Sequence, residues 1–326
     1  MDKEFSQTAK PSWQARCLNA SVRMLVRRSR WGDERAVVRR ARRLFGTPTP
    51  FGWLRTRGLN VQTVHDGTVR GEWVAPARAE EDDGGRSGGG VILYIHGGGY
   101  VSCSAATHRP ITAALARLAR RRVFSLDYRL APEHPFPAAL DDAVAAYRWL
   151  LEEGTAAGQI AFAGDSAGGG LVLGCLLRVR DAGLPVPACA VCFSPWTDLA
   201  GTGESRLQND GRCVMFRPDN IDEFASVYLA GASPRDSYAS PVFADLRDLP
   251  PLLLQVGSTE LLLDDARRVH DKIQAAGGAS RLEIYEDVAH CWQMLDGLVP
   301  EARRALLQAA SFINEHLSPD ARARKA

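Results

Sequence analysis

One serine stands in a glycine-rich segment that could make it a nucleophile. Gly164-Asp165-Ser166-Ala167-Gly168 follows the apolar run IAFA and opens the helical pattern GLVLGCLLRV. A tight turn between a strand and a helix lifts a serine hydroxyl above the sheet, and glycines remove side chains that would collide there. The pattern therefore predicts that Ser166 attacks an electrophilic carbon such as that of a carbonyl group.

A serine nucleophile needs partners, because its hydroxyl is weakly nucleophilic at neutral pH. It needs a base within hydrogen-bond reach and a carboxylate that orients the base. Glu260 follows the apolar run LLLQVG, and His290 follows LEIYED. Both positions come after predicted strands, where sites form in parallel sheets, and they occur in the chain order serine, acid, histidine. They are the predicted acid and base.

Three consecutive glycines directly follow the apolar run VILYI, in His96-Gly97-Gly98-Gly99-Tyr100. Such a run costs backbone entropy, so a folded chain keeps it where N–H groups must approach something closely. We expect the N–H groups of Gly98, Gly99 and Ala167 to stabilise the oxyanion of a tetrahedral intermediate. His96, Gly97 and Asp165 are predicted to support this arrangement, and His96 is expected to hold backbone in place rather than to act in catalysis.

The elements that must position these residues alternate between strands and helices from residue 91. Short apolar runs such as VILYIH, VFSLDY, IAFAGD and ACAVCFSP are separated by helical patterns. This alternation predicts an α/β fold with a mostly parallel central sheet flanked by helices on both faces. Residues 59–76 are predicted as a pair of strands, and the polar, glycine-rich residues 77–90 as a mobile hairpin loop.

The chain starts with two predicted helices of basic character. Residues 1–58 hold 14 Lys and Arg against four Asp and Glu, although the net charge of the whole chain is only +2. In AVVRRARRLF the apolar residues recur at helical spacing and arginines fill the other face, which is typical of a surface helix docked by its apolar stripe. A solvated arginine face is favoured over binding of nucleic acid or anionic lipid, because no nucleic-acid motif accompanies it.

Composition and cysteine usage limit the class of protein. With 326 residues, 45% hydrophobic and 24% charged, the chain is expected to be globular. It has no apolar run long enough for a membrane span and no secretory signal pattern, so we expect a cytoplasmic protein. The seven cysteines are scattered, and Cys189-x-x-Cys192 lies in an apolar run, so reduced, packed thiols are expected. Motifs for nucleotide or zinc binding do not occur, and no cofactor or metal is predicted.

Taken together, these segments make the sequence resemble the hormone-sensitive-lipase-like (bacterial family IV) carboxylesterases of the α/β-hydrolase fold. The resemblance covers about residues 91–317 and rests on HGGGY, DYRLAPEHPFPAALDD, GDSAGG and SPWTDL in that order. It implies that Ser166 is the nucleophile, that His290 is the general base and then acid, and that Gly98, Gly99 and Ala167 form the oxyanion hole. Many members carry Asp-Pro-Leu at the acid; here Glu260 takes that place, and the alternatives left open are Asp264, Asp265 and Asp287.

The resemblance also implies a helical cap over Ser166. Residues 1–55 and 197–243 would form this cap, and residues 56–196 and 244–326 the catalytic domain. Its candidate walls are aromatic residues, each of which is equally suited to core packing: Trp31, Phe45, Phe51, Trp53, Trp196, Phe216 and Tyr228.

The expected activity is that of a serine carboxylesterase acting on small-molecule short- to medium-chain acyl esters through an acyl-enzyme and a Ser-His-Glu triad. The same triad could open a lactone or remove an acetyl group. A receptor on this fold is disfavoured because His290 is present. No nucleic-acid partner is expected, and a homodimer stays open.

Overall fold

The computed structural model describes residues 5–7, 10–28, 33–77 and 90–317. A nine-stranded sheet forms its centre, in the order β1-β9-β8-β7-β6-β4-β5-β3-β2. The predicted loop at residues 77–90 falls almost entirely outside the described residues. The strands are β1 (Phe5–Gln7), β2 (Leu59–Asp66), β3 (Val69–Pro76), β4 (Val91–Ile95), β5 (Arg122–Leu126), β6 (Ile160–Asp165), β7 (Cys189–Phe193), β8 (Leu252–Gly257) and β9 (Ser280–Tyr285).

The sheet is parallel except at the edge where β2 pairs with β3 and β3 with β5. The central strands β4, β6 and β7 are buried over their whole length, as expected for parallel strands covered on both faces. Both cysteines of Cys189-x-x-Cys192 are buried in β7, and no disulfide joins cysteines in the described part of the chain. The sequence interpretation of these residues as packing is therefore confirmed.

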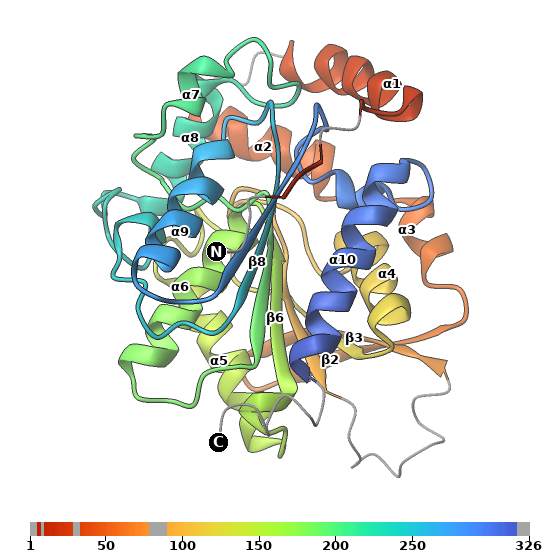
Figure 1. Cartoon of the computed structure of the whole chain (residues 1–326), viewed down its shortest axis with the longest axis vertical. Helices are drawn as coiled ribbons and strands as arrows, with labels where there is room; N and C mark the ends of the chain where they lie inside the picture. Colours follow the sequence, from red (N-terminus) through yellow and green to blue (C-terminus); the bar gives the residue numbers. More distant parts are fainter. Residues whose placement is uncertain (1–4, 8–9, 29–32, 78–89, 318–326) are drawn as a thin grey trace.

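Helices cover the two faces of the sheet and leave its carboxyl end to the site (Figure 1). Along β4, Ile92 and Tyr94 pack toward α4 and α10, whereas Leu93 and Ile95 pack toward α5, α6 and α9. This alternation is the period of two that a strand buried on both faces must show. The covering helices are α4 (Arg109–Ala119), α5 (Ala138–Glu152), α6 (Ala167–Asp181), α9 (Leu263–Ala275) and α10 (Pro300–Leu317).

A second group of helices lies above the carboxyl ends of the strands, at the top of Figure 1. From the N-terminal segment come α1 (Trp13–Val22), the π-helical turn η1 (Arg23–Arg27), α2 (Glu34–Phe45) and, lower on one side, α3 (Pro50–Arg55). From the segment after β7 come α7 (Ser205–Gln208) and α8 (Pro218–Leu229). Four 3-10 helices complete the described elements: η3 (Ala106–His108), η4 (Ala157–Gln159), η5 (Pro241–Phe243) and η6 (Trp292–Leu295).

The predicted apolar stripe of α2 is buried at its first three positions and leaves Leu44 exposed, and the helix starts at a capping residue. Val37, Val38 and Ala41 belong to the main hydrophobic cluster, while the Asp33 side chain accepts a hydrogen bond from the N–H of Ala36. The Pro- and Gly-rich link after α2 contains a further short helix, because α3 begins at Pro50. Proline suits the first turn of a helix, because N–H groups in that turn have no intrahelical acceptor and proline lacks the N–H. No described helix has the length and apolar character needed to cross a membrane.

Candidate active site

Ser166 lies at the turn between β6 and α6, with φ of +54°. Few residues other than glycine adopt this region, and its strain is characteristic of functional turns. The N–H of Ser166 donates to the carbonyl oxygen of Phe193 over 2.8 Å, which ties the turn to β7. A Cβ on Gly168 would lie 2.1 Å from the carbonyl oxygen of Ile95, so this helix start requires glycine. The turn places Ser166 on the wall of a cavity.

His290 and Glu260 meet where the loops after β9 and β8 come together. The Glu260 Oε2 atom lies 2.5 Å from His290 Nδ1, and Oε1 accepts hydrogen bonds from Ser194 Oγ (2.7 Å) and the N–H of Gly257 (2.6 Å). All three side chains are buried. A carboxylate at Nδ1 favours the tautomer with its proton there and leaves Nε2 as an acceptor.

The Nε2 atom of His290 is turned away from Glu260 and is buried. Within the described residues it has no hydrogen-bond partner, and His290 lines the same cavity as Ser166. In ligand-free enzymes the hydrogen bond between nucleophile and base is often long and tightens only with substrate. The arrangement therefore offers an oriented, unoccupied base to a group in the cavity.

The three alternative acids have other partners. Asp264 accepts from the N–H of Ser205, Asp265 accepts from the N–H groups of Thr197 and Asp198, and Asp287 contacts Asn19. Among the described residues, Glu260 is the carboxylate that contacts His290. Ser166 and His290 thus line one cavity, and Glu260 contacts the side of His290 opposite to Nε2.

The three-glycine segment forms a loop beside Ser166. Gly98 and Gly99 have φ of +112° and +63°, and both line the cavity. A Cβ on Gly98 would lie 2.3 Å from the carbonyl oxygen of Ser102, and one on Gly99 would lie 2.6 Å from the ring of Phe224. Within the described chain the N–H groups of these two glycines donate no hydrogen bond. They are thus available to a bound oxygen atom.

The cavity has a volume of about 390 Å³ and is mostly apolar. Four of the predicted aromatic walls line it: Phe45, Phe51, Trp196 and Phe216. Two predicted walls do not. Trp53 is exposed on α3, and Tyr228 stacks on Tyr100 in the core with ring centroids 3.7 Å apart. Trp31 lies outside the described residues.

Comparisons with known proteins identify the fold and the class of relatives. Residues 92–294 match a family model described as the alpha/beta hydrolase fold. The chain is 44% identical over 81% of its length to an acetyl-hydrolase of Streptomyces hygroscopicus, of which 85% is covered, and 35% identical over 73% to an esterase of Acinetobacter venetianus, of which 79% is covered. A crystal structure of an esterase from the bacterial hormone-sensitive lipase family superposes with a TM-score of 0.84 at 37% identity, covering 95% of this chain and all of that one.

The chain belongs to the alpha/beta hydrolase family. Within it, the chain is one of the hormone-sensitive-lipase-like esterases, as the resemblance implied. A second crystal structure of the group, the esterase EstE5 soaked with p-nitrophenyl butyrate, gives a TM-score of 0.83 at 37% identity over 94% of this chain and 99% of that one.

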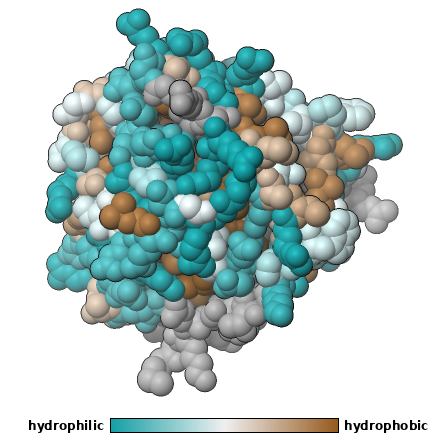
Figure 2. All heavy atoms as spheres, turned by 90° about the horizontal axis from the view of Figure 1, so that it is seen from above, coloured by the Kyte–Doolittle hydropathy of each residue, from teal (hydrophilic) through white to brown (hydrophobic). Residues whose placement is uncertain are grey.

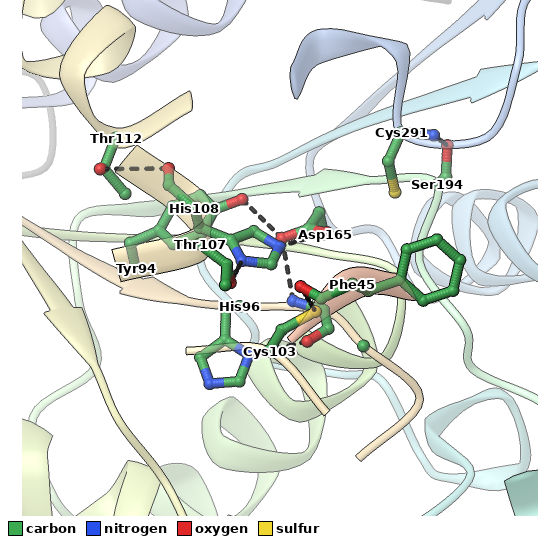
Figure 3. Close-up of polar contacts among 12 residues, drawn as sticks. Phe45, Tyr94, His96, Cys103, Thr107, His108, Thr112, Asp165, Ser194 and Cys291 are labelled. Carbon is green, nitrogen blue, oxygen red and sulfur yellow. Dashed lines mark hydrogen bonds and ion pairs between the residues drawn. The ribbon is translucent and has the colours of Figure 1, made fainter. Parts of the chain in front are cut away.

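In this hydrolase, Asp165 joins several segments around the serine turn (Figure 3). Its carboxylate accepts from Tyr94 Oη (2.6 Å) and from the N–H of Gly97 (3.0 Å), and it lies 3.3 Å from His108 Nε2. Burial alone would raise the pKa of this carboxyl, but His108 and then Tyr94 lower it below its usual range. The charged Asp165 therefore anchors the glycine loop to the end of β6.

His96 holds backbone in this hydrolase. Its ring stacks on Tyr128 with centroids 4.2 Å apart, and its Nδ1 lies 2.7 Å from the carbonyl oxygen of Gly97. Burial, and next the nearby His108, lower the pKa of His96 to about 3, so the ring is neutral at ordinary pH.

His108 was not predicted from the sequence, yet it lines the cavity and contacts Asp165. The available signal was weak: the residue lies directly before the Arg109-Pro110 start of α4, shortly after the glycine loop. The apolar residues Leu18 and Val22 of α1 also line the cavity and were not singled out as walls. A helical stripe shows that such residues face inward, but not what they face.

Proposed function

We propose that this esterase-family hydrolase is a serine carboxylesterase that cleaves short- to medium-chain acyl esters through a Ser166-His290-Glu260 triad. One observation carries the proposal: His290, held by Glu260 through Nδ1, and Ser166, on its strained turn, line one apolar cavity. The names of its relatives, esterase and acetyl-hydrolase, support the same class of reaction.

In the first half of the reaction, the Ser166 hydroxyl attacks the ester carbonyl carbon while His290 Nε2 takes its proton. The N–H groups of Gly98, Gly99 and Ala167 hold the resulting oxyanion, an effect that is worth about 3–4 kcal/mol for one donor in a known protease. His290 then gives the proton to the leaving alkoxide, which departs as the alcohol. Glu260 stabilises the imidazolium between these steps.

In the second half, a water molecule gives a proton to His290 Nε2 and attacks the acyl carbon of the ester on Ser166. The tetrahedral intermediate collapses, the proton returns to Ser166 Oγ, and the carboxylic acid leaves. Asp165 and His96 support these steps indirectly, because they fix the glycine loop that carries the oxyanion donors.

We further propose that residues 1–55 and 197–243 act as a cap that shapes the acyl site. Support comes from the cavity walls: Leu18, Val22, Phe45 and Phe51 belong to the first segment, and Phe216, Ile221 and Phe224 to the second. An apolar cavity of about 390 Å³ is of the size that small ligands occupy, which favours short and medium acyl chains over long ones.

A second candidate is the hydrolysis of acetyl groups in particular. It is favoured by the 44% identity to a protein named acetyl-hydrolase. The two candidates use the same residues and differ in how much of the apolar cavity the acyl group fills.

The test is hydrolysis of p-nitrophenyl esters from acetate to palmitate by the wild type and by Ser166→Ala. We expect kcat/KM to peak at short to medium chains and the kcat of the variant to fall by ~10⁴-fold or more. A maximum at acetate with a steep decline at butyrate would select the acetyl candidate. A folded Ser166→Ala variant with near wild-type turnover would contradict the proposed nucleophile.

A further inference from the structure

Helix α1 and the turn η1 that continues it present an exposed face of unusual composition. Side chains on this face recur at steps of three and one residues, so they form a single stripe along the helix. We call it the outer stripe; it consists of Trp13, Arg16, Cys17, Ala20, Ser21, Met24, Leu25 and Arg28. Trp13, Met24 and Leu25 are 70%, 61% and 66% exposed. Most of the large side chains on this outward face are thus apolar.

More exposed apolar side chains lie near the outer stripe. Trp53 and Leu54 on α3 are 66% and 50% exposed. A shallow depression bordered by Gln14 of α1 and Arg55 of α3 shows that the two helices flank the same part of the surface. Seen from above, brown apolar atoms gather on the side where α1 and α3 lie in Figure 1, beside teal polar ones (Figure 2). Large exposed apolar side chains gathered on one side of a protein mark an interaction site.

The charges on α1 and η1 themselves have one sign, although Arg27 of η1 pairs with Asp210 of the second cap segment. Residues 10–28 contain one Lys and four Arg and no Asp or Glu. On α2, Arg39 and Arg43 are exposed as well. Apolar side chains interspersed with arginines, on a helix too short and polar to span a membrane, are typical of helices that lie in the plane of a lipid surface.

We propose that the outer stripe, with α3 beside it, docks this protein on anionic phospholipid surfaces. Trp13, Met24 and Leu25 would enter the boundary between headgroups and acyl chains, and the arginines would pair with lipid phosphates. A second copy of the chain fits this face less well, because a twofold interface sets the same patch against itself and would bring arginines together.

The cavity opens close to the outer stripe, so docking on a lipid surface would bring that opening to the lipid. The inner side of α1 contributes Leu18 and Val22 to the cavity, and the exposed residues Leu44, Thr47 and Thr49 also line it. The cavity therefore reaches the surface between α1 and the link from α2 to α3. A lipid surface held against the outer stripe would lie beside this opening, so that acyl esters dissolved in it could enter.

The test is co-sedimentation of the full-length protein with extruded vesicles. We compare neutral phosphatidylcholine with phosphatidylcholine containing a third phosphatidylglycerol, at low and high salt. We expect binding to the anionic vesicles to be at least ~10-fold tighter than to the neutral ones at low salt, and to weaken as salt is added. Equal or absent binding to both vesicles would overturn the proposal.

Two pairs of variants separate the apolar and the charged contributions. Trp13→Ser with Leu25→Ser leaves the charge unchanged and should weaken binding by ~10-fold or more, whereas Val186→Ser, exposed in the loop after α6, should not. Arg39→Glu with Arg43→Glu should weaken binding to the anionic vesicles by ~5-fold per charge removed. The control is Arg148→Glu, an exposed position on α5, which should leave this binding unchanged.

Circular dichroism confirms that each variant is folded, and hydrolysis of a water-soluble p-nitrophenyl ester should be unchanged in all of them. Vesicle binding requires no turnover, so its failure is distinct from failure of the proposed esterase mechanism. Wild-type dimers that dissociate in the Trp13→Ser/Leu25→Ser variant, without vesicle binding, would instead assign the face to a second copy. Salt-dependent binding to duplex DNA without vesicle binding would assign it to nucleic acid. Either result overturns the lipid proposal.

Discussion

At Glu260 both carboxylate oxygens are engaged, one with His290 and the other with Ser194 and the backbone of Gly257. Glu260→Gln keeps the shape of the side chain but removes the charge that stabilises an imidazolium. We expect kcat to fall by ~10²–10⁴-fold with KM little changed, because the lost interaction acts mainly in the transition state. Steady-state kinetics with p-nitrophenyl butyrate measures this.

The control for Glu260 is Asp264→Asn, on a neighbouring carboxylate that accepts from Ser205 and does not contact His290. Its kcat should stay within about threefold of wild type, since the triad is intact. If Asp264→Asn were the slow variant and Glu260→Gln the active one, the role of the acid would pass to Asp264.

Asp265 makes stability depend on pH. Burial raises the pKa of this carboxyl from 3.8 to about 8, despite its hydrogen bonds from the N–H groups of Thr197 and Asp198. The folded state thus binds a proton that the unfolded state releases near pH 4. This contribution to stability is fully present below pH 4 and is lost as pH rises from about 4 to about 8.

Asp265→Asn mimics the protonated carboxyl and keeps Oδ1 as the acceptor. We expect its Tm to be closest to that of the wild type at pH 4 and to exceed it by several degrees at pH 9. Thermal unfolding followed by circular dichroism across this range measures the difference. Parallel curves for the two proteins would show that Asp265 is ionised in the folded state throughout.

Among the elements, those with strong local patterns were predictable and those defined by tertiary contact were not. Strands β4, β6 and β7 are apolar runs buried on both faces, and the stripe of α2 fixes its buried side. Strand β1 has only three residues and exists because it pairs with β9, which its own sequence does not encode. The position of His108 beside Asp165 likewise depends on the packing of η3 and α4 against β6.

The same distinction applies to the site. Ser166 and the glycine loop follow recognisable strands, so local sequence predicts their neighbours. Trp53 and Tyr228 were expected on the cavity wall because they are aromatic, yet aromatic character is equally suited to surface and core. Both residues lie on helices, α3 and α8, and a helical period does not reveal whether a given face meets the cavity, the core or solvent.

Helix α1 allows a test of whether the cap shapes the acyl site, because one side of the helix lines the cavity and the other side is exposed. Val22 lines the cavity, whereas Ala20 belongs to the exposed outer stripe. Val22→Phe should reduce the space for acyl chains and lower kcat/KM for octanoate by ~10-fold or more relative to acetate. Ala20→Phe adds a larger side chain to the same helix and should leave the ratio unchanged. A shift of similar size in both variants would mean that α1 acts through its stability and not as a wall.

At the scale of the whole molecule, the two ends of the described chain are tied together. The N–H and Oγ of Ser12, the capping residue of α1, donate to the buried carboxylate of Glu301 at the start of α10 over 2.7 and 2.9 Å. Ser12 also accepts a hydrogen bond from the N–H of Ala15, so the N-cap of α1 and the Ser12–Glu301 contact form one hydrogen-bond network. The Ser12–Glu301 contact holds α1 against the rest of the molecule, and with it the residues of α1 that line the cavity and the outer stripe.

Glu301→Ala should therefore loosen α1 without unfolding the sheet. Losing two hydrogen bonds to a charged group is worth ~1–3 kcal/mol, so amide exchange in residues 13–22 should become ~5- to 100-fold faster while β6 keeps its protection. Hydrogen exchange with mass spectrometry resolves the two segments, and Glu152→Ala on the exposed side of α5 serves as the control. Glu301→Gln retains an acceptor for the Ser12 N–H and should fall between alanine and wild type. Faster exchange in β6 as well would show that the contact stabilises the whole fold, and unchanged exchange in α1 would show that its apolar face suffices to hold it.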